Sequence, residues 1–201
     1  MRKILLTGFD PFNKEKINPS WEAIKDIRAE NIKVLQLATS FKRAKETLIE
    51  VINQYQPDIV LMIGQAGGRS MISLEKVAIN LKDGQIADND GYKPSNEKIR
   101  QDGADGYFST LDLDALLVEL KDKLIPCHIS YTAGTYVCNS VLYEALYYAK
   151  KKSIDYQAGF VHIPYLPSQV LDKARTTPSM DLNMIKSAIK IILDFLSKTN
   201  D

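Results

Sequence analysis

The chain has 201 residues, 45% of them hydrophobic and 25% charged, a composition that predicts a globular domain large enough to bury a substantial core. Its 26 Lys and Arg residues balance 25 Asp and Glu residues, so the formal charge of +1 does not favour nucleic acid or an anionic membrane surface as a partner. The two cysteines, Cys127 and Cys138, and the two histidines, His128 and His162, lack the spacing of a structural zinc site. We therefore expect a single domain over residues 1–201 that holds no metal and binds no nucleic acid.

The first residues do not have the pattern of a targeting segment. Residues 1–8 begin with charged side chains, but the apolar run that follows is too short for a signal peptide, and no later stretch approaches a membrane span. Thiols stay reduced in the cytosol. We therefore expect a cytoplasmic protein with free cysteines that has no membrane partner.

In the first third of the chain, short apolar runs alternate with segments of helical spacing. The runs predict strands over residues 4–9, 32–38 and 58–64. A helix capped by Ser20 follows the first strand, and a helix over residues 42–55 follows the second. Because the runs are continuously apolar, the strands should be buried on both faces, as in a mostly parallel α/β sheet.

The middle of the chain combines an alternating strand with a long irregular segment. Residues 74–81 alternate in polarity, and Glu75 falls on the same side as Val77 and Ile79, where a carboxylate needs a partner. Residues 83–110 are rich in Asp, Asn and Gly and show no periodicity. So long an irregular segment inside a compact domain is usually functional or disordered.

The rest of the chain returns to alternating helices and strands. Helical spacing covers residues 111–124 and 136–151, and an amphipathic helix covers residues 181–198. Strands are predicted over residues 127–131 and 159–163. The pattern as a whole is typical of the α/β class.

Cys138 is a candidate for chemistry because it lies at a helix start. With Thr135 as the N-cap, Cys138 would be among the first three helical residues, where free N–H groups and the helix dipole favour a thiolate and can hold an oxyanion. Position alone favours the alternative, a small buried hydrophobic residue, by roughly two to one.

His162 ends a predicted strand, at the edge where open α/β sheets bind their ligands. A hydrogen-bonded core histidine explains its position equally well. His128 is the weaker candidate because it begins a strand and should lie near the opposite edge of a parallel sheet, and Cys127 precedes it directly.

A glycine-rich turn over residues 64–69 would let the backbone approach a ligand closely. The turn does not match a nucleotide-phosphate loop, and no serine lies in a G-x-S-x-G elbow, so neither a nucleotide cofactor nor a serine hydrolase is indicated. A cysteine, a histidine and the carboxylate of Glu75 remain. In such a set the carboxylate orients the imidazole, the imidazole takes the thiol proton, and the thiolate attacks an acyl carbon.

Six segments of the chain, in order, are similar to the type I pyroglutamyl peptidases, also called pyrrolidone-carboxylate peptidases. The segments are TGFDPF (7–12), INPSWEA (17–23), GQAGGR (64–69), EKVAIN (75–80), TAGTYVCN (132–139) and GFVHIPYLP (159–167). The resemblance implies a three-layer α/β/α sandwich with a mostly parallel mixed central sheet. It also implies a cytosolic cysteine peptidase, without a cofactor, that releases the N-terminal pyroglutamyl (5-oxoprolyl) residue from peptides.

The resemblance further implies roles for individual residues. The nucleophile, the general base and acid, and the orienting carboxylate would be Cys138, His162 and Glu75. The pyrrolidone ring would be bound by Phe9, Phe12 and Gln65. A neutral lactam suits an aromatic slot with a few hydrogen bonds, whereas a free α-amino group would be an unpaired buried charge there.

Members of the family often form homo-oligomers, so the resemblance implies a dimer or tetramer. Tyr143, Tyr147 and Tyr148 lie on one predicted helix and would suit a contact surface between copies. Packing within the chain explains these three side chains equally well.

The chain departs from the family pattern in places. Asn13 and Lys14 stand where the family has two glycines. In DGQIADN (83–89), Gln85 replaces an arginine with a supporting role near the oxyanion, and we place Gln85 at the substrate site as an uncharged donor. Asp88 in the same segment is a rival or second carboxylate near that site.

Two other functions remain open. Gln85 and the altered glycines are consistent with a catalytically weakened or inactive homologue that binds a lactam-like small molecule. A phosphorylase-like enzyme on a similar α/β fold is the weaker alternative, because the chain has no motif that cradles phosphate.

Overall fold

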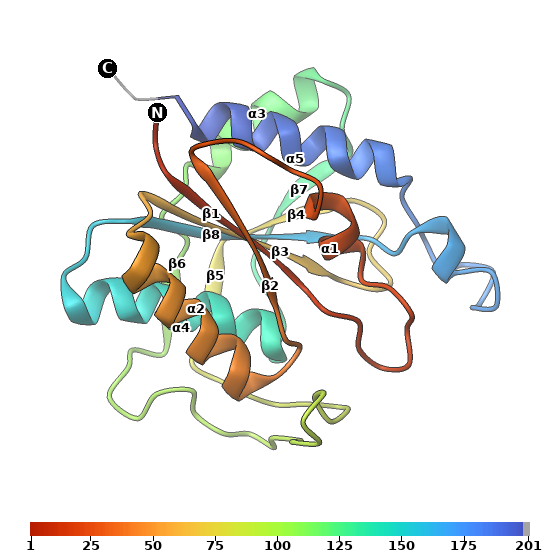
Figure 1. Cartoon of the computed structure of the whole chain (residues 1–201). Helices are drawn as coiled ribbons and strands as arrows, with labels where there is room; N and C mark the ends of the chain where they lie inside the picture. Colours follow the sequence, from red (N-terminus) through yellow and green to blue (C-terminus); the bar gives the residue numbers. More distant parts are fainter. Residues whose placement is uncertain (199–201) are drawn as a thin grey trace.

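The computed structural model describes residues 1–198 and is built around a six-stranded sheet (Figure 1). The strands follow the order β2 (Ile32–Leu37), β1 (Ile4–Phe9), β3 (Ile59–Gln65), β8 (Gln157–Ile163), β4 (Ile72–Glu75) and β7 (Cys127–Ser130). The first four are parallel, whereas β4 pairs antiparallel with β8 and parallel with β7. The expectation of a mostly parallel mixed sheet is confirmed.

Helices cover both faces of this sheet (Figure 1). One layer consists of α2 (Phe41–Tyr55) and α4 (Val137–Lys152), and the other of α1 (Pro19–Ile24), α3 (Leu113–Asp122) and α5 (Leu182–Leu196). The chain therefore forms a three-layer α/β/α sandwich, as expected. Across the described residues, 1–198, no helix is both long enough and apolar enough to cross a membrane.

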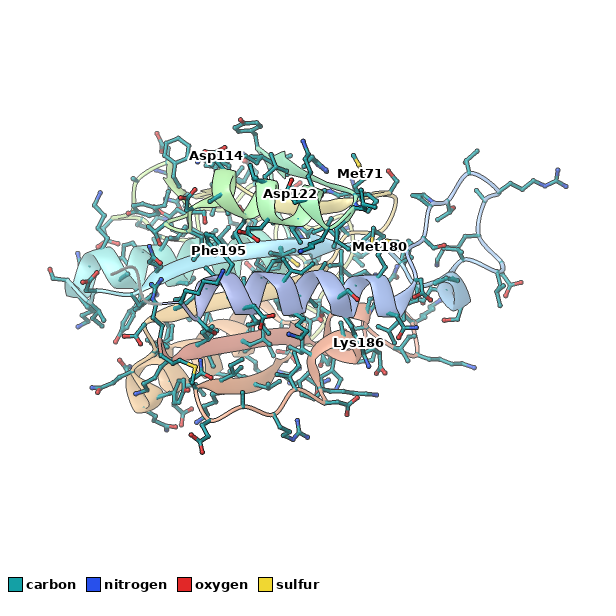
Figure 2. All side chains as sticks on the ribbon, turned by 90° about the horizontal axis from the view of Figure 1, so that it is seen from above. Met71, Asp114, Asp122, Met180, Lys186 and Phe195 are labelled. Carbon is teal, nitrogen blue, oxygen red and sulfur yellow. The ribbon has the colours of Figure 1, made fainter. Side chains whose placement is uncertain are left out.

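Side chains that alternate along each strand supply two separate cores. On β1, Leu5 packs beneath α2 and α4, whereas Ile4 and Leu6 pack beneath the other layer. Figure 2 looks onto that other layer, where α3, with Asp114, runs beside α5, with Lys186. All residues of β1 and β3 are buried, because a strand between two helical layers has no solvent-facing side.

The segment predicted as one strand over residues 74–81 forms two strands in different sheets. β4 ends at Glu75, and Lys76 donates its backbone N–H to β7. The chain then leaves the central sheet, and β5 (Val77–Ile79) pairs antiparallel with β6 (Gly106–Phe108). The polar and apolar residues keep alternating across the break, so the hydrophobic pattern does not reveal it.

Helix α1 begins two residues earlier than predicted. Its N-cap is Asn18, whose side-chain oxygen accepts from the backbone N–H and the hydroxyl of Ser20. The Ser20 hydroxyl in turn accepts the N–H of Phe9 at 2.9 Å. Ser20 therefore does not cap the helix but ties it to the end of β1, next to the site described below.

Candidate active site

His162 lies near the carboxyl end of β8, between the neighbouring strands β3 and β4. It pairs in register with Gly64 on β3 and with Ser73 on β4. Its side chain is buried on the sheet face that packs against α4, beside the ring of Phe160 at a centroid distance of 4.7 Å. The predicted position at a strand end is confirmed.

Glu75 reaches His162 across the antiparallel pair of β4 and β8. Oε1 of Glu75 lies 2.7 Å from Nδ1 of His162, and both side chains are buried. An ionised carboxylate can only accept a hydrogen bond, so the ring proton of the neutral imidazole lies on Nδ1. Nε2 then carries the lone pair that a general base needs.

Arg69, in the loop after β3, is a second partner for the same carboxylate oxygen. Nη1 of Arg69 lies 2.6 Å from Oε1 of Glu75, and Nη2 donates to the carbonyl of Thr132 at 2.8 Å. Burial alone would raise the pKa of Glu75, but the hydrogen bond with His162 and the charges of His162 and Arg69 outweigh it and hold that pKa below its usual range. Glu75 is therefore ionised at neutral pH.

Cys138 is the second residue of α4 and lies in the first turn, as expected, but the cap differs from the prediction. The N-cap is Tyr136, which makes no side-chain capping bond. Thr135 is not the cap, because its hydroxyl donates instead to the carbonyl of Asp83 at 2.8 Å. The N–H groups of this first turn receive no side-chain cap, so they are available to hold an oxyanion beside Cys138.

The sulfur of Cys138 lies over Gly64. A Cβ at Gly64 would approach Sγ to 3.0 Å and the ring of Phe160 to 2.5 Å, so a glycine is needed to leave room for both. Gly64 is also the register partner of His162. The fold therefore brings the thiol and the imidazole together from two separate elements.

Burial determines the resting protonation of these two groups. It raises the pKa of Cys138 to about 12, and the negative charge of Glu75 adds to the rise. It lowers the pKa of His162, although the hydrogen bond with Glu75 opposes this. Both groups are thus neutral at neutral pH. The backbone N–H of Cys138 does favour the thiolate, as expected for a helix start, but desolvation outweighs this effect.

A cavity of about 230 Å³ opens in front of the thiol and the imidazole. Cys138 and His162 line it together with Phe9, Phe12 and Gln65, the residues expected to bind a ring. The lining residues that the sequence interpretation did not assign are Asn18, Thr39, Ala66, Arg69, Ala133, Gly134 and Tyr136. Most of these lie inside the motifs quoted above, so their position in the chain is the signal that could have found them.

Gln85 and Asp88 lie away from this cavity. Gln85 is exposed, and none of the described residues that line the cavity comes from residues 83–110. Backbone hydrogen bonds of the two preceding residues to Thr135 and Pro94 hold the chain so that Gln85 faces outward. The carboxylate of Asp88 accepts the backbone N–H groups of Phe41, Asp90 and Tyr92. Asp88 therefore anchors the segment to α2 and does not compete with Glu75.

His128 lies closer to His162 than predicted, although it is not part of the cavity. Because β4 and β7 run opposite to β8, Ser73 is the register partner of both histidines. The expectation that His128 would lie near the opposite edge assumed a fully parallel sheet and is wrong. Among residues 1–198, no three side chains of His, Cys, Asp or Glu gather closely enough to hold a metal ion.

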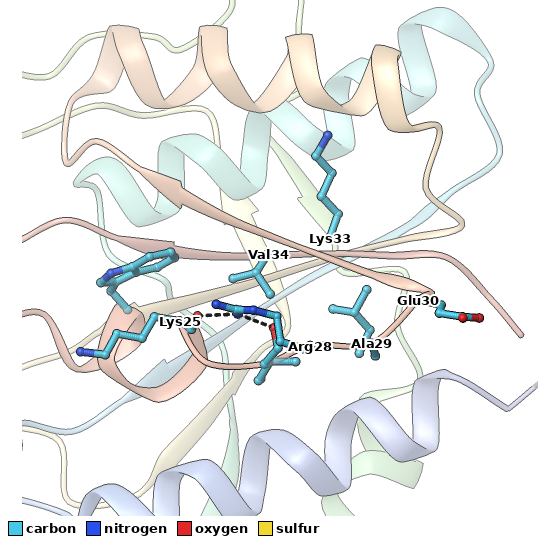
Figure 3. A pocket seen from close by; sticks show the side chains of 9 residues that line it. Lys25, Arg28, Ala29, Glu30, Lys33 and Val34 are labelled. Carbon is cyan, nitrogen blue, oxygen red and sulfur yellow. Dashed lines mark hydrogen bonds between the residues drawn. The ribbon is translucent and has the colours of Figure 1, made fainter.

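A larger hollow of about 810 Å³ lies between α1 and the edge strand β2 (Figure 3). Its lining includes Lys25, Arg28, Glu30 and Lys33, and the guanidinium of Arg28 donates to the carbonyl of Lys25 at 2.8 Å. No cysteine or histidine is found among its described lining residues. The hollow is therefore unrelated to the thiol chemistry.

Comparison with known proteins gives a consistent family. Residues 2–199 match the family model described as pyroglutamyl peptidase. Pyrrolidone-carboxylate peptidase of Fusobacterium nucleatum is 48% identical over 206 residues, covering 100% of this chain and 96% of that protein. The enzyme of the same name from Bacillus subtilis is 44% identical and covers 94% of this chain and 90% of its own length.

Solved structures agree with the sequence relatives. The crystal structure of pyroglutamyl peptidase I from Bacillus amyloliquefaciens superposes with a TM-score of 0.91 at 42% identity, covering 95% of this chain and 94% of that one. A mutant pyrrolidone carboxyl peptidase from Pyrococcus furiosus gives a TM-score of 0.90 at 38% identity, with 96% of each chain covered. With a thiol and an imidazole at one cavity and a buried carboxylate behind the imidazole, the chain belongs to the pyroglutamyl peptidase family of cysteine peptidases.

Proposed function

We propose that this chain is a cysteine exopeptidase that hydrolyses the bond after an N-terminal pyroglutamyl residue of peptides. The observation that carries the proposal is that Cys138 and His162 face one small cavity while Glu75 holds the imidazole from behind at 2.7 Å. The names of the relatives support the same activity.

In the acylation step, Sγ of Cys138 attacks the carbonyl carbon of the pyroglutamyl residue. Nε2 of His162 takes the thiol proton as the C–S bond forms, so the neutral pair becomes a thiolate and an imidazolium only during attack. Glu75, which is ionised, stabilises the imidazolium through Nδ1. The N–H groups at the start of α4 stabilise the oxyanion.

The tetrahedral intermediate then breaks its C–N bond. His162 returns its proton to the leaving amine, which departs as the shortened peptide, and the pyroglutamyl group remains on Cys138 as a thioester. A water molecule gives one proton to His162 and adds to the thioester carbon, after which the C–S bond breaks. The sulfur regains its proton, and pyroglutamate leaves.

The cavity favours a neutral ring at its inner end. The ring of Phe12 packs on Tyr136 at a centroid distance of 6.1 Å, and Phe9 closes another side. No Asp or Glu is present among the described residues that line the cavity, whereas Arg69 brings a positive charge to it. A protonated α-amino group would therefore meet a cation and no carboxylate, which disfavours ordinary peptide N-termini.

Hydrolysis of a 5-oxoprolyl arylamide by wild type and by Cys138→Ala tests the proposal directly. We expect wild type to release the arylamine and the variant to lose activity by about 10³-fold or more. An acid-quenched wild-type reaction should also show a pyroglutamyl adduct on Cys138 by mass spectrometry. Equal rates for the two proteins would refute the nucleophile.

The alternative, a homologue that binds a lactam without turnover, rests on Gln85 in place of the family arginine. Gln85 is exposed and is not among the described residues that line the cavity, so the cavity described above is formed without it. Under this alternative, 2-pyrrolidone would raise the melting temperature of wild type while the arylamide stayed intact. Turnover that depends on Cys138 would exclude it.

We further propose one domain over residues 1–201, a cytoplasmic location and a dimer or tetramer. A nucleophilic thiol needs a reducing compartment, and both cysteines are free. Tyr143 and Tyr147 are buried within the chain and do not support a contact surface on α4. Light scattering at several concentrations tests the assembly.

A further inference from the structure

Gln169 lies behind the cavity and contacts a residue that lines it. It ends the short helix η1 (Pro167–Gln169), which follows β8. Nε2 of Gln169 donates to Oε1 of Gln65 at 3.0 Å, and both side chains are at least nine-tenths buried. Gln65 lines the cavity, whereas Gln169 is not among the described lining residues.

The backbone determines how the Gln169 amide is turned. Its Oε1 accepts the backbone N–H of Leu166 at 3.0 Å, and because an N–H can only donate, the oxygen must face Leu166. The NH₂ group then faces Gln65 and also Glu15, whose carboxylate accepts at 3.2 Å. Lys173 holds that carboxylate at 2.7 Å. Every neighbour thus favours the same orientation.

The orientation of the Gln169 amide determines the orientation of the Gln65 amide. Because Oε1 of Gln65 receives the donor of Gln169, its own NH₂ group is the end that remains for the cavity. Among the hydrogen bonds within residues 1–198, Gln65 takes part through Oε1, and its NH₂ group, which is not among the fully buried atoms that lack a partner, is accessible from the cavity. A reversed Gln65 would place its NH₂ group against the NH₂ group of Gln169, two donors without an acceptor, and lose the bond to Gln169.

We propose that Gln169 is a positioning residue that makes Gln65 a hydrogen-bond donor toward the ring carbonyl of the substrate. The inference rests on the proposed function, since it assigns selectivity for the 5-oxo group of the pyroglutamyl ring. A lactam carbonyl accepts from the Gln65 NH₂ group. A five-membered ring without that carbonyl leaves the Gln65 donor without its acceptor, which weakens the binding of that ring.

Gln169→Glu is the sharpest variant because it keeps the shape and removes the donor. One carboxylate oxygen can still accept from Leu166, but the other faces Oε1 of Gln65 and repels it, so Gln65 turns its own oxygen into the cavity. We expect kcat/KM for a 5-oxoprolyl arylamide to fall by about tenfold or more, chiefly through KM. For a cyclopentanecarbonyl arylamide, which has no ring carbonyl, we expect a change of less than about twofold.

Two further variants separate positioning from a general loss of structure. Gln169→Leu removes all three side-chain hydrogen bonds of Gln169 and should reduce selectivity between the two arylamides without changing the pH profile. Lys173→Met removes a charge from the same segment and from the same Glu15 but leaves the Gln169 contacts intact, so it should keep wild-type selectivity. Circular dichroism melts confirm that each variant is folded.

Acidification gives a readout that a purely structural role would not move. When the introduced carboxyl is protonated, it regains a donor for Gln65, and neighbouring Glu15 favours that protonation whereas Lys173 opposes it. Relative to wild type at each pH, the KM of Gln169→Glu should fall back toward the wild-type value as the pH is lowered. Gln169→Leu should show no such recovery.

The inference is wrong if Gln169→Glu and Gln169→Leu keep the wild-type KM and the wild-type selectivity. Failure of the proposed function looks different, because wild type itself would then leave the 5-oxoprolyl arylamide intact. In that case the affinity for 2-pyrrolidone tests the role of Gln169. Weaker binding to Gln169→Glu than to Lys173→Met supports the inference, and equal binding to the two variants overturns it.

Discussion

Nη1 of Arg69 lies 2.6 Å from Oε1 of Glu75, the same oxygen that accepts the Nδ1 proton of His162. The carboxylate is completely buried, whereas the arginine side chain is 27% exposed at the cavity. One cation therefore offsets the buried charge of Glu75 and also acts on the pKa of His162.

We predict that Arg69→Met shifts the acid limb of the kcat/KM profile to higher pH. Burial has the largest effect on the pKa of His162 and lowers it. Glu75 raises this pKa, and the positive charge of Arg69 lowers it. Removing that charge raises the pKa, so the imidazole becomes protonated, and unable to accept the thiol proton, at a higher pH. Steady-state kinetics on a 5-oxoprolyl arylamide across the pH range measure the shift.

The same variant should lose stability, by about 1–2 kcal/mol once the partial exposure of the arginine is taken into account. Arg69→Lys is the matched control, because it keeps the charge but cannot bridge Glu75 and the Thr132 carbonyl with two nitrogens. It should retain the wild-type acid limb while losing part of the stability. An unshifted limb in Arg69→Met would show that Arg69 does not act on His162.

The two thiols should differ in how alkylation depends on pH. Burial raises the pKa of Cys138 to about 12, so in the free enzyme the rate of its reaction with iodoacetamide should keep rising by about tenfold per pH unit through neutrality and beyond. A resting thiolate paired with an imidazolium would instead react at a nearly constant rate. Peptide mapping of the modified protein measures the rate at each cysteine.

Cys127→Ser supplies the control for that experiment. Cys127 is buried in the core beneath α3, and burial raises its pKa as well. Its replacement should leave activity intact, and alkylation of the variant should still abolish hydrolysis in step with modification of Cys138. A pH-independent alkylation rate near neutrality would contradict the neutral resting pair.

Gly64→Ala should impair both folding and catalysis because its new methyl group meets two fixed neighbours. The Cβ would lie 2.5 Å from the Phe160 ring and 3.0 Å from Sγ of Cys138. Overpacking of this kind costs about 1–3 kcal/mol and would displace the sulfur from its place beside His162. Denaturant unfolding and kcat measure the two effects.

Phe160→Leu combined with Gly64→Ala separates the two contacts. Removing the ring relieves the shorter contact, so the double variant should be more stable than the sum of the single changes predicts. Its activity should remain low, since the contact with Cys138 persists. Full activity in Gly64→Ala would mean that the sulfur position is not critical.

Much of the fold follows from local patterns, and what does not depends on pairing between distant segments. Continuous apolar runs identify β1 and β3, because strands between two helical layers are buried on both sides. The reversed direction of β4 and β7 has no such local signature, and for that reason His128 was expected at the wrong edge. The break after Glu75 is hidden because alternation continues through it.

The candidate site likewise combines features that the sequence predicts with features that depend on the fold. Cys138, His162 and Glu75 lie in motifs that can be recognised in the sequence, and the structure places Cys138 and His162 at one cavity with Glu75 behind His162. Their protonation depends on burial, which is a property of the folded chain, so a helix start alone predicts the wrong resting state for the thiol. Gln169 is equally invisible in the sequence, since its role depends on a contact with a residue on a distant strand.

The turn after Phe12 offers a prediction about stability. Asn13 and Lys14, which stand where the family has two glycines, both have left-handed backbones, with φ values of 52° and 64°. Glu15 donates its N–H to the carbonyl of Phe12 at 3.1 Å, so the four residues form a turn of the type that favours glycine at its third position. Asn tolerates the left-handed conformation, whereas the same conformation is strained in Lys.

Lys14→Gly should therefore stabilise the protein by about 1 kcal/mol, which corresponds to a rise of about 2–4 °C in Tm for a chain of this length. Catalysis should be unchanged, because Lys14 is exposed and is not among the described residues that line the cavity. Lys16→Gly is the matched control: Lys16 is also exposed but has no positive φ, so glycine there only adds flexibility to the unfolded chain and should lower Tm. Calorimetry of the two variants decides the matter, since a fall in Tm for both would show that the left-handed turn stores no strain at Lys14.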